Sequence, residues 1–314
     1  MHTTIRKIIA KSILPAAVAL VLSACQGDST PTVEFIPEVR EITATQTPDT
    51  SEGSAPPSAP PVVATGPASI TDLVLITGQS NALGSQTTYD PVLDQPVEGF
   101  YAYTDQGWQQ ASLQQVWDLG WHPFKGLGDD PHNNFGFHFG KQVVANSSRV
   151  VGIVLVTAPG EGINHWDADN YFFNKIRNKA LAALNELPQK STFDGILWHQ
   201  GETDWSVRGS LDPELSEWEL DDNYYSNKLW QLVDNFRNET WFDHGKPFIC
   251  GETAQAPVND RLMALNRNSD PWTACVEGEG LDTWDEEVNV HFTAASLRIL
   301  GANYAEQYLL MTGN

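Results

Sequence analysis

The sequence has little of what most metal sites need. Its 314 residues include only three cysteines, and its eight histidines form neither a His-Glu-x-x-His nor a His-x-His pattern. Zinc centres depend on thiolates and imidazoles at such fixed spacings. We therefore expect no metal site, and no motif in the chain requires a cofactor.

Basic residues are also scarce. Lysine and arginine number 18 against 40 aspartates and glutamates, which gives a formal net charge of −22. A surface of this sign repels phosphate backbones and anionic lipid headgroups. The composition therefore argues against binding to DNA or RNA, and it leaves the oligomeric state open.

No apolar stretch reaches the roughly 20 residues of a membrane-spanning helix. The N-terminus instead has three basic residues, a short apolar stretch over residues 13–22, and then Ser-Ala-Cys ending at Cys25. This order is typical of a secretion signal, and Leu-Ser-Ala-Cys resembles the lipidation box of bacterial lipoproteins. We expect residues 1–24 to be removed and Cys25 to be lipidated, which would make an exported, membrane-anchored protein in the periplasm or at the cell surface. The alternative is an ordinary signal peptide that happens to contain Cys25.

Residues 25–69 are rich in proline, threonine and serine and show almost no apolar periodicity. Such a segment cannot bury enough surface to offset the entropy of ordering, so we predict a disordered linker. Residues 70–314 have the length of one α/β domain.

Apolar runs of strand length alternate with helical periodicity in this domain. The strand-like runs are residues 73–76, 150–156, 195–198, 247–250 and, more weakly, 274–276. The residues expected on buried helix faces are Phe135, Phe139, Val143, Ile176, Ala180, Leu184, Tyr225, Leu229, Leu232, Phe236 and, after a cap at Thr293, Leu297, Leu300, Tyr304 and Tyr308. This alternation predicts an α/β fold, a three-layer α/β/α sandwich with a mostly parallel central sheet.

Two cysteines remain after Cys25. They are Cys250 and Cys275, and in an exported protein such a pair favours a disulfide. The alternative is two buried free thiols.

The first strand-like run leads directly to a serine. Residues 73–76 are followed by Thr-Gly-Gln-Ser-Asn, in which the serine is Ser80. Esterases with α/β folds present their nucleophile in this way, where a strand ends in a sharp turn and a helix begins. The first N–H groups of a helix favour developing negative charge, so Ser80 is the candidate nucleophile. The alternative is an ordinary turn with a serine or asparagine helix cap.

A serine hydroxyl needs a base within hydrogen-bond reach. His291 lies just before the last predicted helix and can fold back over the edge of the sheet. Ligands of parallel sheets collect at the carboxyl ends of the strands, where Ser80, Gly160 and Gln200 should emerge from separate runs. His138 falls within the pattern of a packed helix, and we interpret it as structural.

Three motifs resemble those of a known family. Gly-Gln-Ser-Asn at Ser80, Gln-Gly-Glu at Gln200 and His-Phe at His291 resemble the SGNH-type carbohydrate esterases, in particular the sialate O-acetylesterase and acetylxylan esterase group. The resemblance extends over residues 73–304 and implies an SGNH-hydrolase-like fold with Ser80 as nucleophile and His291 as base. It also implies an oxyanion hole made by the N–H groups of Ser80 and Gly160 and the amide of Gln200, with Gly162 as the alternative glycine.

Side chains beside these motifs are expected to contact substrate or to support the catalytic groups. They are Asn81, His199, Glu202 and Trp166. Several tryptophans offer surfaces for stacking on sugar rings, whereas core packing is favoured for Trp198 and Trp230. The tryptophans in the first group are Trp108, Trp117, Trp121, Trp166 and Trp205.

The sequence departs from this family at one position. The family places an aspartate three residues before the histidine to orient its imidazole, and here that position is Val288. Glu287, the nearest acid along the chain, is the candidate orienting carboxylate. Asp285, Glu202 and a Ser–His dyad held by a backbone carbonyl are the alternatives. Loss of an orienting carboxylate lowers turnover by about 10⁴ in a serine protease.

These features predict a serine esterase that removes O-acetyl groups from a polysaccharide or from sialic acid through an acyl-enzyme, without a cofactor. One alternative is a non-catalytic glycan-binding lipoprotein on the same fold, because a fold does not fix a function. A lipase or thioesterase is a weaker alternative, since the polar, acidic and tryptophan-rich loops disfavour an apolar acyl pocket.

Overall fold

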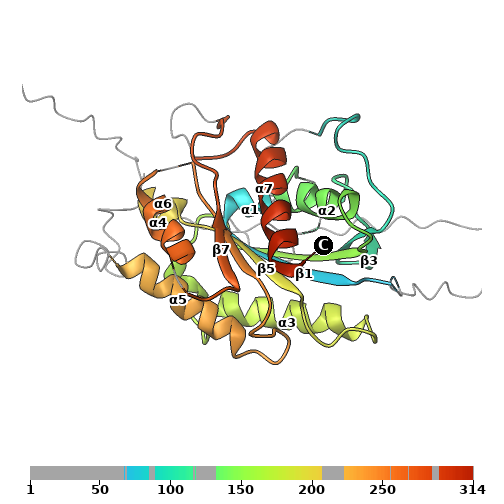
Figure 1. Cartoon of the computed structure of the whole chain (residues 1–314), viewed down its shortest axis with the longest axis horizontal. Coiled ribbons are helices and arrows are strands. Elements are labelled where there is room, and N and C mark those ends of the chain that lie inside the picture. The colour runs from blue at the N-terminus through green and yellow to red at the C-terminus, as the bar shows by residue number, and fades with distance from the viewer. Residues whose placement is uncertain are drawn as a thin grey trace, which may run out of the picture. The chain divides into compact units, whose positions relative to one another are not determined.

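Figure 1 shows the computed structural model of the chain. The structure describes residues 67, 69–84, 89–115, 117, 132–206, 223–254, 256–267, 269–284 and 290–313, all of which lie in one compact unit, Ala59–Asn314. The predicted signal peptide, the predicted lipidation site Cys25 and nearly all of the predicted linker lie outside the described residues. Within them, no helix combines the length and the apolar character that crossing a membrane requires.

A seven-stranded sheet forms the centre of the described unit. Its strands are β1 (Asp72–Gly78), β2 (Phe100–Thr104), β3 (Gly107–Gln110), β4 (Val151–Thr157), β5 (Gly195–His199), β6 (Phe248–Gly251) and β7 (Thr273–Val276). They lie in the order β3-β2-β4-β1-β5-β6-β7, and all neighbours are parallel except β2 and β3. Every residue of β1 and β4 is buried, as central strands covered on both faces require. The five predicted strands and the mostly parallel sheet are confirmed.

Helices cover both faces of this sheet (Figure 1). The long helices are α2 (Phe135–Ala145), α3 (Tyr171–Asn185), α5 (Tyr224–Arg237) and α7 (Ala294–Thr312), and the short ones are α1 (Ser80–Leu83), α4 (Glu202–Ser206) and α6 (Ala256–Leu262). One face packs against α2 and α7, and the other against α3 and α5. The predicted apolar faces of all four long helices are buried. The Thr293 side chain caps α7 by accepting a hydrogen bond from Ser296 N at 3.1 Å, as predicted.

The hairpin of β2 and β3 was not predicted, and it changes the interpretation of two tryptophans. Trp108 lies on β3, is only 7% exposed, and donates its indole N–H to Ala183 O at 3.2 Å. Trp117 is also buried, edge-on against Phe100 with 5.8 Å between ring centroids. The prediction that these two side chains stack on sugar rings is therefore wrong, because both contribute to the core. The two strands are short and turn at Gly107 (φ +83°), so the sequence gives little periodicity to detect.

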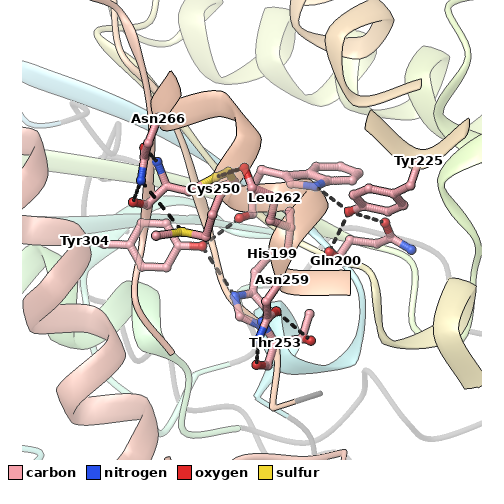
Figure 2. Close-up of a disulfide and its surroundings, with 12 residues drawn as sticks. His199, Gln200, Tyr225, Cys250, Thr253, Asn259, Leu262, Asn266 and Tyr304 are labelled. Atoms are coloured by element: carbon pink, nitrogen blue, oxygen red, sulfur yellow. Dashed lines mark hydrogen bonds between the residues drawn. A yellow bond between two sulfur atoms is a disulfide. The ribbon is translucent and has the colours of Figure 1, made fainter. Parts of the chain in front are cut away.

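A disulfide joins Cys250 on β6 to Cys275 on β7, which confirms the predicted bridge (Figure 2). The two cysteines are directly opposite each other in the parallel register, and their Cα atoms are 4.3 Å apart. The bridge closes the segment that contains α6 and a following 3₁₀ turn, Met263–Arg267. It therefore fixes an edge strand and the helical segment before it to the sheet.

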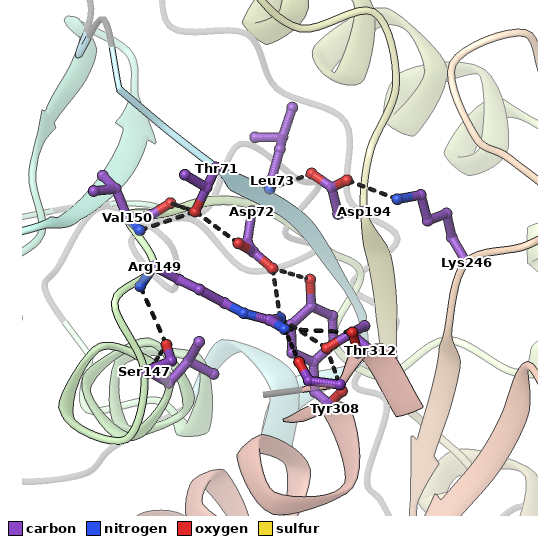
Figure 3. A network of polar contacts seen from close by, with 12 residues as sticks. Thr71, Asp72, Leu73, Ser147, Arg149, Val150, Asp194, Lys246, Tyr308 and Thr312 are labelled. Carbon is purple, nitrogen blue, oxygen red and sulfur yellow. Dashed lines mark hydrogen bonds and ion pairs between the residues drawn. The ribbon is translucent and has the colours of Figure 1, made fainter. Parts of the chain in front are cut away.

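A network of charged groups closes the amino ends of the strands (Figure 3). Asp72 at the start of β1 accepts hydrogen bonds from Arg149 Nη1 and from the Tyr308 hydroxyl, each at 2.8 Å. Arg149 also binds Thr312, the last residue of α7. These bonds attach the end of the C-terminal helix to the first strand, at the sheet edge opposite to the serine.

His138 on α2 is buried, as its structural interpretation requires. Its Nε2 lies 2.7 Å from Asn133 Oδ1 and 3.9 Å from Asp94 Oδ1. Burial lowers the pKa of His138 to about 3, because the nearby charge of Asp94 offsets only part of the cost of burying an imidazolium. The folded protein therefore keeps this imidazole neutral at pH values at which the unfolded chain protonates it.

Acid should destabilise the fold through His138. The pKa of this group is lower in the folded state, so its contribution to the free energy of unfolding is fully present above about pH 6.5. As the pH falls toward 3, the free energy of unfolding decreases by about 1.4 kcal/mol per pH unit. We expect the wild type to lose roughly 2–3 kcal/mol more than His138→Gln between pH 7 and pH 4.5. Urea unfolding of both proteins at the two pH values measures this difference, and an identical loss in both would contradict the assignment.

Candidate functional site

Three neighbouring strands end at one edge of the sheet and bring the predicted motifs together. β4, β1 and β5 are adjacent and parallel, and they end at Thr157, Gly78 and His199. Ser80, Gly160 and Gln200 follow these ends within three residues. The structure thus gathers at a single edge three motifs that the sequence places on separate runs.

The turn that presents Ser80 depends on Gly78. This residue has φ +141°, and a Cβ built on it would lie 1.9 Å from the His199 carbonyl oxygen. Gln79 then fixes the turn to β5, because its backbone N–H donates to His199 O at 3.0 Å and its side-chain oxygen accepts from Thr203 N at 3.2 Å. The helix that begins at Ser80 is α1, which is a single turn, so the expected contribution of a helix dipole is small.

Ser80 and His291 meet although 211 residues separate them. His291 Nε2 lies 3.0 Å from Ser80 Oγ, and Ser80 is 7% exposed. The separation lies within the range at which a base takes a proton from a nucleophile. The geometry suits a Ser–His pair at the carboxyl edge of the sheet.

Trp284 is a neighbour of His291 that the motifs did not indicate. The indole stacks on the imidazole with 5.6 Å between ring centroids and 13° between ring planes. The backbone N–H of Trp284 donates to His291 O at 3.0 Å, and an antiparallel bridge between Thr283 and Phe292 brings the two segments together. The only available signal was a tryptophan seven residues before the histidine, which no periodicity distinguishes from any other loop aromatic.

The orienting carboxylate remains a prediction. Glu287, Asp285 and Val288 lie outside the described residues. Glu202, proposed as an alternative, has its carboxylate directed elsewhere: its Oε1 accepts from Asn81 Nδ2 at 2.5 Å and lies 3.3 Å from His199 Nε2. Among the described residues these two side chains, and not His291, are its partners, so Glu202 does not orient the base directly.

Glu202 is a buried charge held by its neighbours. Its exposed fraction is 1%. Burial opposes the charged form, but the contacts with His199 and Asn81 outweigh it and lower the pKa of Glu202 below its usual range. His199, expected to support the site or to contact substrate, is fully buried between the rings of Phe135 and Phe292, so it has a supporting position.

The predicted oxyanion groups have different surroundings. Gly160 is exposed with φ +80°, and a Cβ there would have no atom within 4 Å. Gln200 is fully buried, and its Nε2 donates to Glu161 O at 3.1 Å and to Asp204. Its Oε1 accepts from the Tyr225 hydroxyl at 3.0 Å (Figure 2). Both N–H groups of this amide thus have acceptors, and Gln200 would have to exchange one of them to reach an oxyanion.

Trp166 does not offer a surface to a sugar. It lies in the 3₁₀ turn Ile163–Trp166, is 1% exposed, and packs edge-on against Trp198 with 5.3 Å between ring centroids. Core packing therefore replaces the predicted stacking for this residue, and the core packing predicted for Trp198 is confirmed, since Trp198 is fully buried. Trp121 and the side chain of Trp205 lie outside what the structure describes.

Most of the chain resembles a known protein family. Residues 70–310 match the family model described as carbohydrate esterase, sialic acid-specific acetylesterase. A search of curated proteins gives no match.

Solved structures resemble the chain in fold. A protein from Arabidopsis thaliana is similar with a TM-score of 0.55 and 20% identity, covering 76% of this chain and 98% of that one. NanS is similar with a TM-score of 0.51 and 15% identity, covering 79% and 98%. A carbohydrate acetylesterase from Xanthomonas citri is similar with a TM-score of 0.51 and 18% identity, covering 76% and 56%. These likenesses support the three-layer fold.

Proposed function

Because the chain belongs to the sialic acid-specific acetylesterase family of carbohydrate esterases, we propose that it removes O-acetyl groups from a carbohydrate with Ser80 as nucleophile and His291 as base. The observation that supports this most directly is the 3.0 Å separation between Ser80 Oγ and His291 Nε2. The position of the pair at the carboxyl edge of a parallel sheet, where such sheets bind ligands, supports it further.

The proposed reaction is a two-step acyl transfer. His291 Nε2 takes the proton of Ser80 as Oγ attacks the acetyl carbonyl carbon, and the resulting oxyanion binds to nearby N–H groups. The bond to the sugar oxygen then breaks, and His291 returns the proton to the leaving alcohol. Water, deprotonated by the same imidazole, attacks the acetyl-enzyme and releases acetate. No cofactor takes part in this scheme.

The remaining roles complete the proposal. The backbone N–H groups of Ser80 and Gly160 serve as oxyanion donors. Gln200 is a third donor when one N–H of its side-chain amide leaves its present acceptor, Glu161 O or Asp204, and donates to the oxyanion. Glu287 orients His291. The chain is exported and tethered to a bacterial membrane through Cys25, and the disulfide between Cys250 and Cys275 supports an oxidising compartment.

The test is acetate release from three substrates: O-acetylated sialic acid, acetylated xylan and an aryl acetate. The wild type should release acetate from the aryl ester and from at least one acetylated carbohydrate, while aryl butyrate and octanoate react more slowly. Rates that rise with acyl length would favour a lipase or thioesterase instead. Glycan binding without any ester hydrolysis would overturn the proposal in favour of a non-catalytic binding protein.

A further inference from the structure

Asn81, the residue after the nucleophile, binds the backbone on both sides of His291. Its side-chain Nδ2 donates to Val290 O at 2.9 Å, and its Oδ1 accepts from Phe292 N at 3.0 Å. Asn81 is 2% exposed, so water does not compete strongly for these bonds. One amide therefore fixes the segment that carries the base, while the preceding residue supplies the nucleophile.

Glu202 fixes the orientation of this amide. The second hydrogen of Asn81 Nδ2 donates to Glu202 Oε1 at 2.5 Å, which is a bond to an ionised acceptor and hence a strong one. If the amide were flipped, its oxygen would face the carboxylate and its NH₂ would face the N–H of Phe292. Both contacts would be repulsive, so a single orientation is stable.

Glu202 is itself held by rigid groups. His199 Nε2 lies 3.3 Å from Glu202 Oε1, and His199 Nδ1 lies 3.3 Å from the Tyr304 oxygen. The Tyr304 hydroxyl donates to Trp198 O on β5 at 2.6 Å (Figure 2). The chain of contacts thus runs from the backbone beside His291 to a central strand and to α7.

We propose that Asn81 is a positioning residue for His291 and that Glu202 acts on the reaction only through Asn81. The inference rests on the proposed esterase function, and it deepens it by assigning a role to an acid that touches neither the base nor the nucleophile. A displacement of the imidazole by about 1 Å would slow a reaction of this kind by roughly 10²-fold. Asn81 and Glu202 are 2% and 1% exposed, so we expect substrate binding not to depend on this contact.

The first test separates kcat from KM. We expect Asn81→Ala to lower kcat by roughly 10²-fold and to leave KM nearly unchanged. Glu202→Ala should lower kcat similarly, and Glu202→Gln less, since a glutamine oxygen can still accept from Asn81. The double variant Asn81→Ala/Glu202→Ala should be no slower than Asn81→Ala, because residues that act as one unit are not additive. Losses that multiply would overturn the proposal.

The second test exchanges the two groups across the contact. Asn81→Asp alone sets two carboxylates against each other, whereas Asn81→Asp/Glu202→Gln restores one carboxylate and one amide donor. The double exchange should be faster than Asn81→Asp alone, and a double exchange no faster than the single one would overturn the proposal. This comparison decides the question if Asn81→Ala does not fold.

Asp72→Asn is the matched control. Asp72 is also a buried carboxylate, but it lies at the opposite edge of the sheet and binds Arg149 and Tyr308. The control should lose stability in a thermal melt while keeping the wild-type kcat. If it loses kcat as Asn81→Ala does, the effect is general destabilisation and the proposal fails.

Labelling of Ser80 by a fluorophosphonate distinguishes failure of this inference from failure of the proposed function. The probe needs an activated serine but no carbohydrate, so its rate reports the position of His291 directly. Slower labelling in Asn81→Ala than in the wild type supports the inference even if no acetylated carbohydrate is hydrolysed. If the wild type hydrolyses acetyl esters and Asn81→Ala is labelled as fast as the wild type, the inference is overturned while the proposed function stands.

Discussion

Replacing Ser80 by alanine is expected to lower kcat/KM for acetyl-ester hydrolysis by roughly 10⁴- to 10⁶-fold, or about 5–8 kcal/mol of transition-state stabilisation. The reason is that Ser80 Oγ is the atom that would form the acyl bond, and the alanine variant can do no more than bind substrate beside the oxyanion donors. Acetate release from an aryl acetate measures the loss.

Ser147→Ala controls for the removal of a partly buried serine hydroxyl. Ser147 lies after α2, where its hydroxyl donates to Val143 O at 2.6 Å, and it should keep wild-type activity. The melting temperature of Ser80→Ala should stay close to that of the wild type, since one lost hydrogen bond costs only about 1 kcal/mol. A folded Ser80→Ala that still hydrolyses the ester within tenfold of the wild-type rate would place the nucleophile elsewhere.

His291→Ala is expected to cause a loss of similar size. Removing the imidazole at 3.0 Å takes away the base that the structure places beside Ser80 Oγ. The double variant Ser80→Ala/His291→Ala should be no slower than either single variant, because nucleophile and base act as a unit. Steady-state kinetics with an aryl acetate and fluorophosphonate labelling of Ser80 both measure the effect.

His244→Ala is the control for this second prediction. His244 is exposed and lies in the loop between α5 and β6, away from the carboxyl edge of the strands. It should hydrolyse acetyl esters at the wild-type rate. If His291→Ala loses less than tenfold while remaining folded, another group is the base and the Ser–His assignment is wrong.

The main elements of the fold could be predicted because burial leaves a local pattern. Residues 73–76 and 150–156 are continuous apolar runs since β1 and β4 are covered on both faces. The face of α7 that includes Leu297 and Tyr304 repeats at helical spacing for the same reason. The β2–β3 hairpin could not be predicted, because two short strands around Gly107 contain too few residues to show a periodicity.

The candidate site could be predicted only in part, because a motif names residues without their partners. Gly-Gln-Ser-Asn indicated Ser80, but it gave Asn81 no distinct role. The sequence left Glu202 among the alternatives for the orienting acid, whereas in the structure its carboxylate binds Asn81 and His199. Likewise, the sequence does not distinguish a tryptophan that is buried in the core, as Trp166 is, from one that stacks on the base, as Trp284 does.

The sequence by itself determined five of the seven strands, the buried helix faces, the cysteine pair and the serine at the end of β1. Each of these follows from residues close together in the chain, where hydrophobic period and turn chemistry act. Only the tertiary structure decided that His291 reaches Ser80, that Asn81 binds the backbone on both sides of His291, and that the Gln200 amide already has acceptors. These contacts join segments as far as 211 residues apart, and their geometry depends on how the strands and α7 pack together.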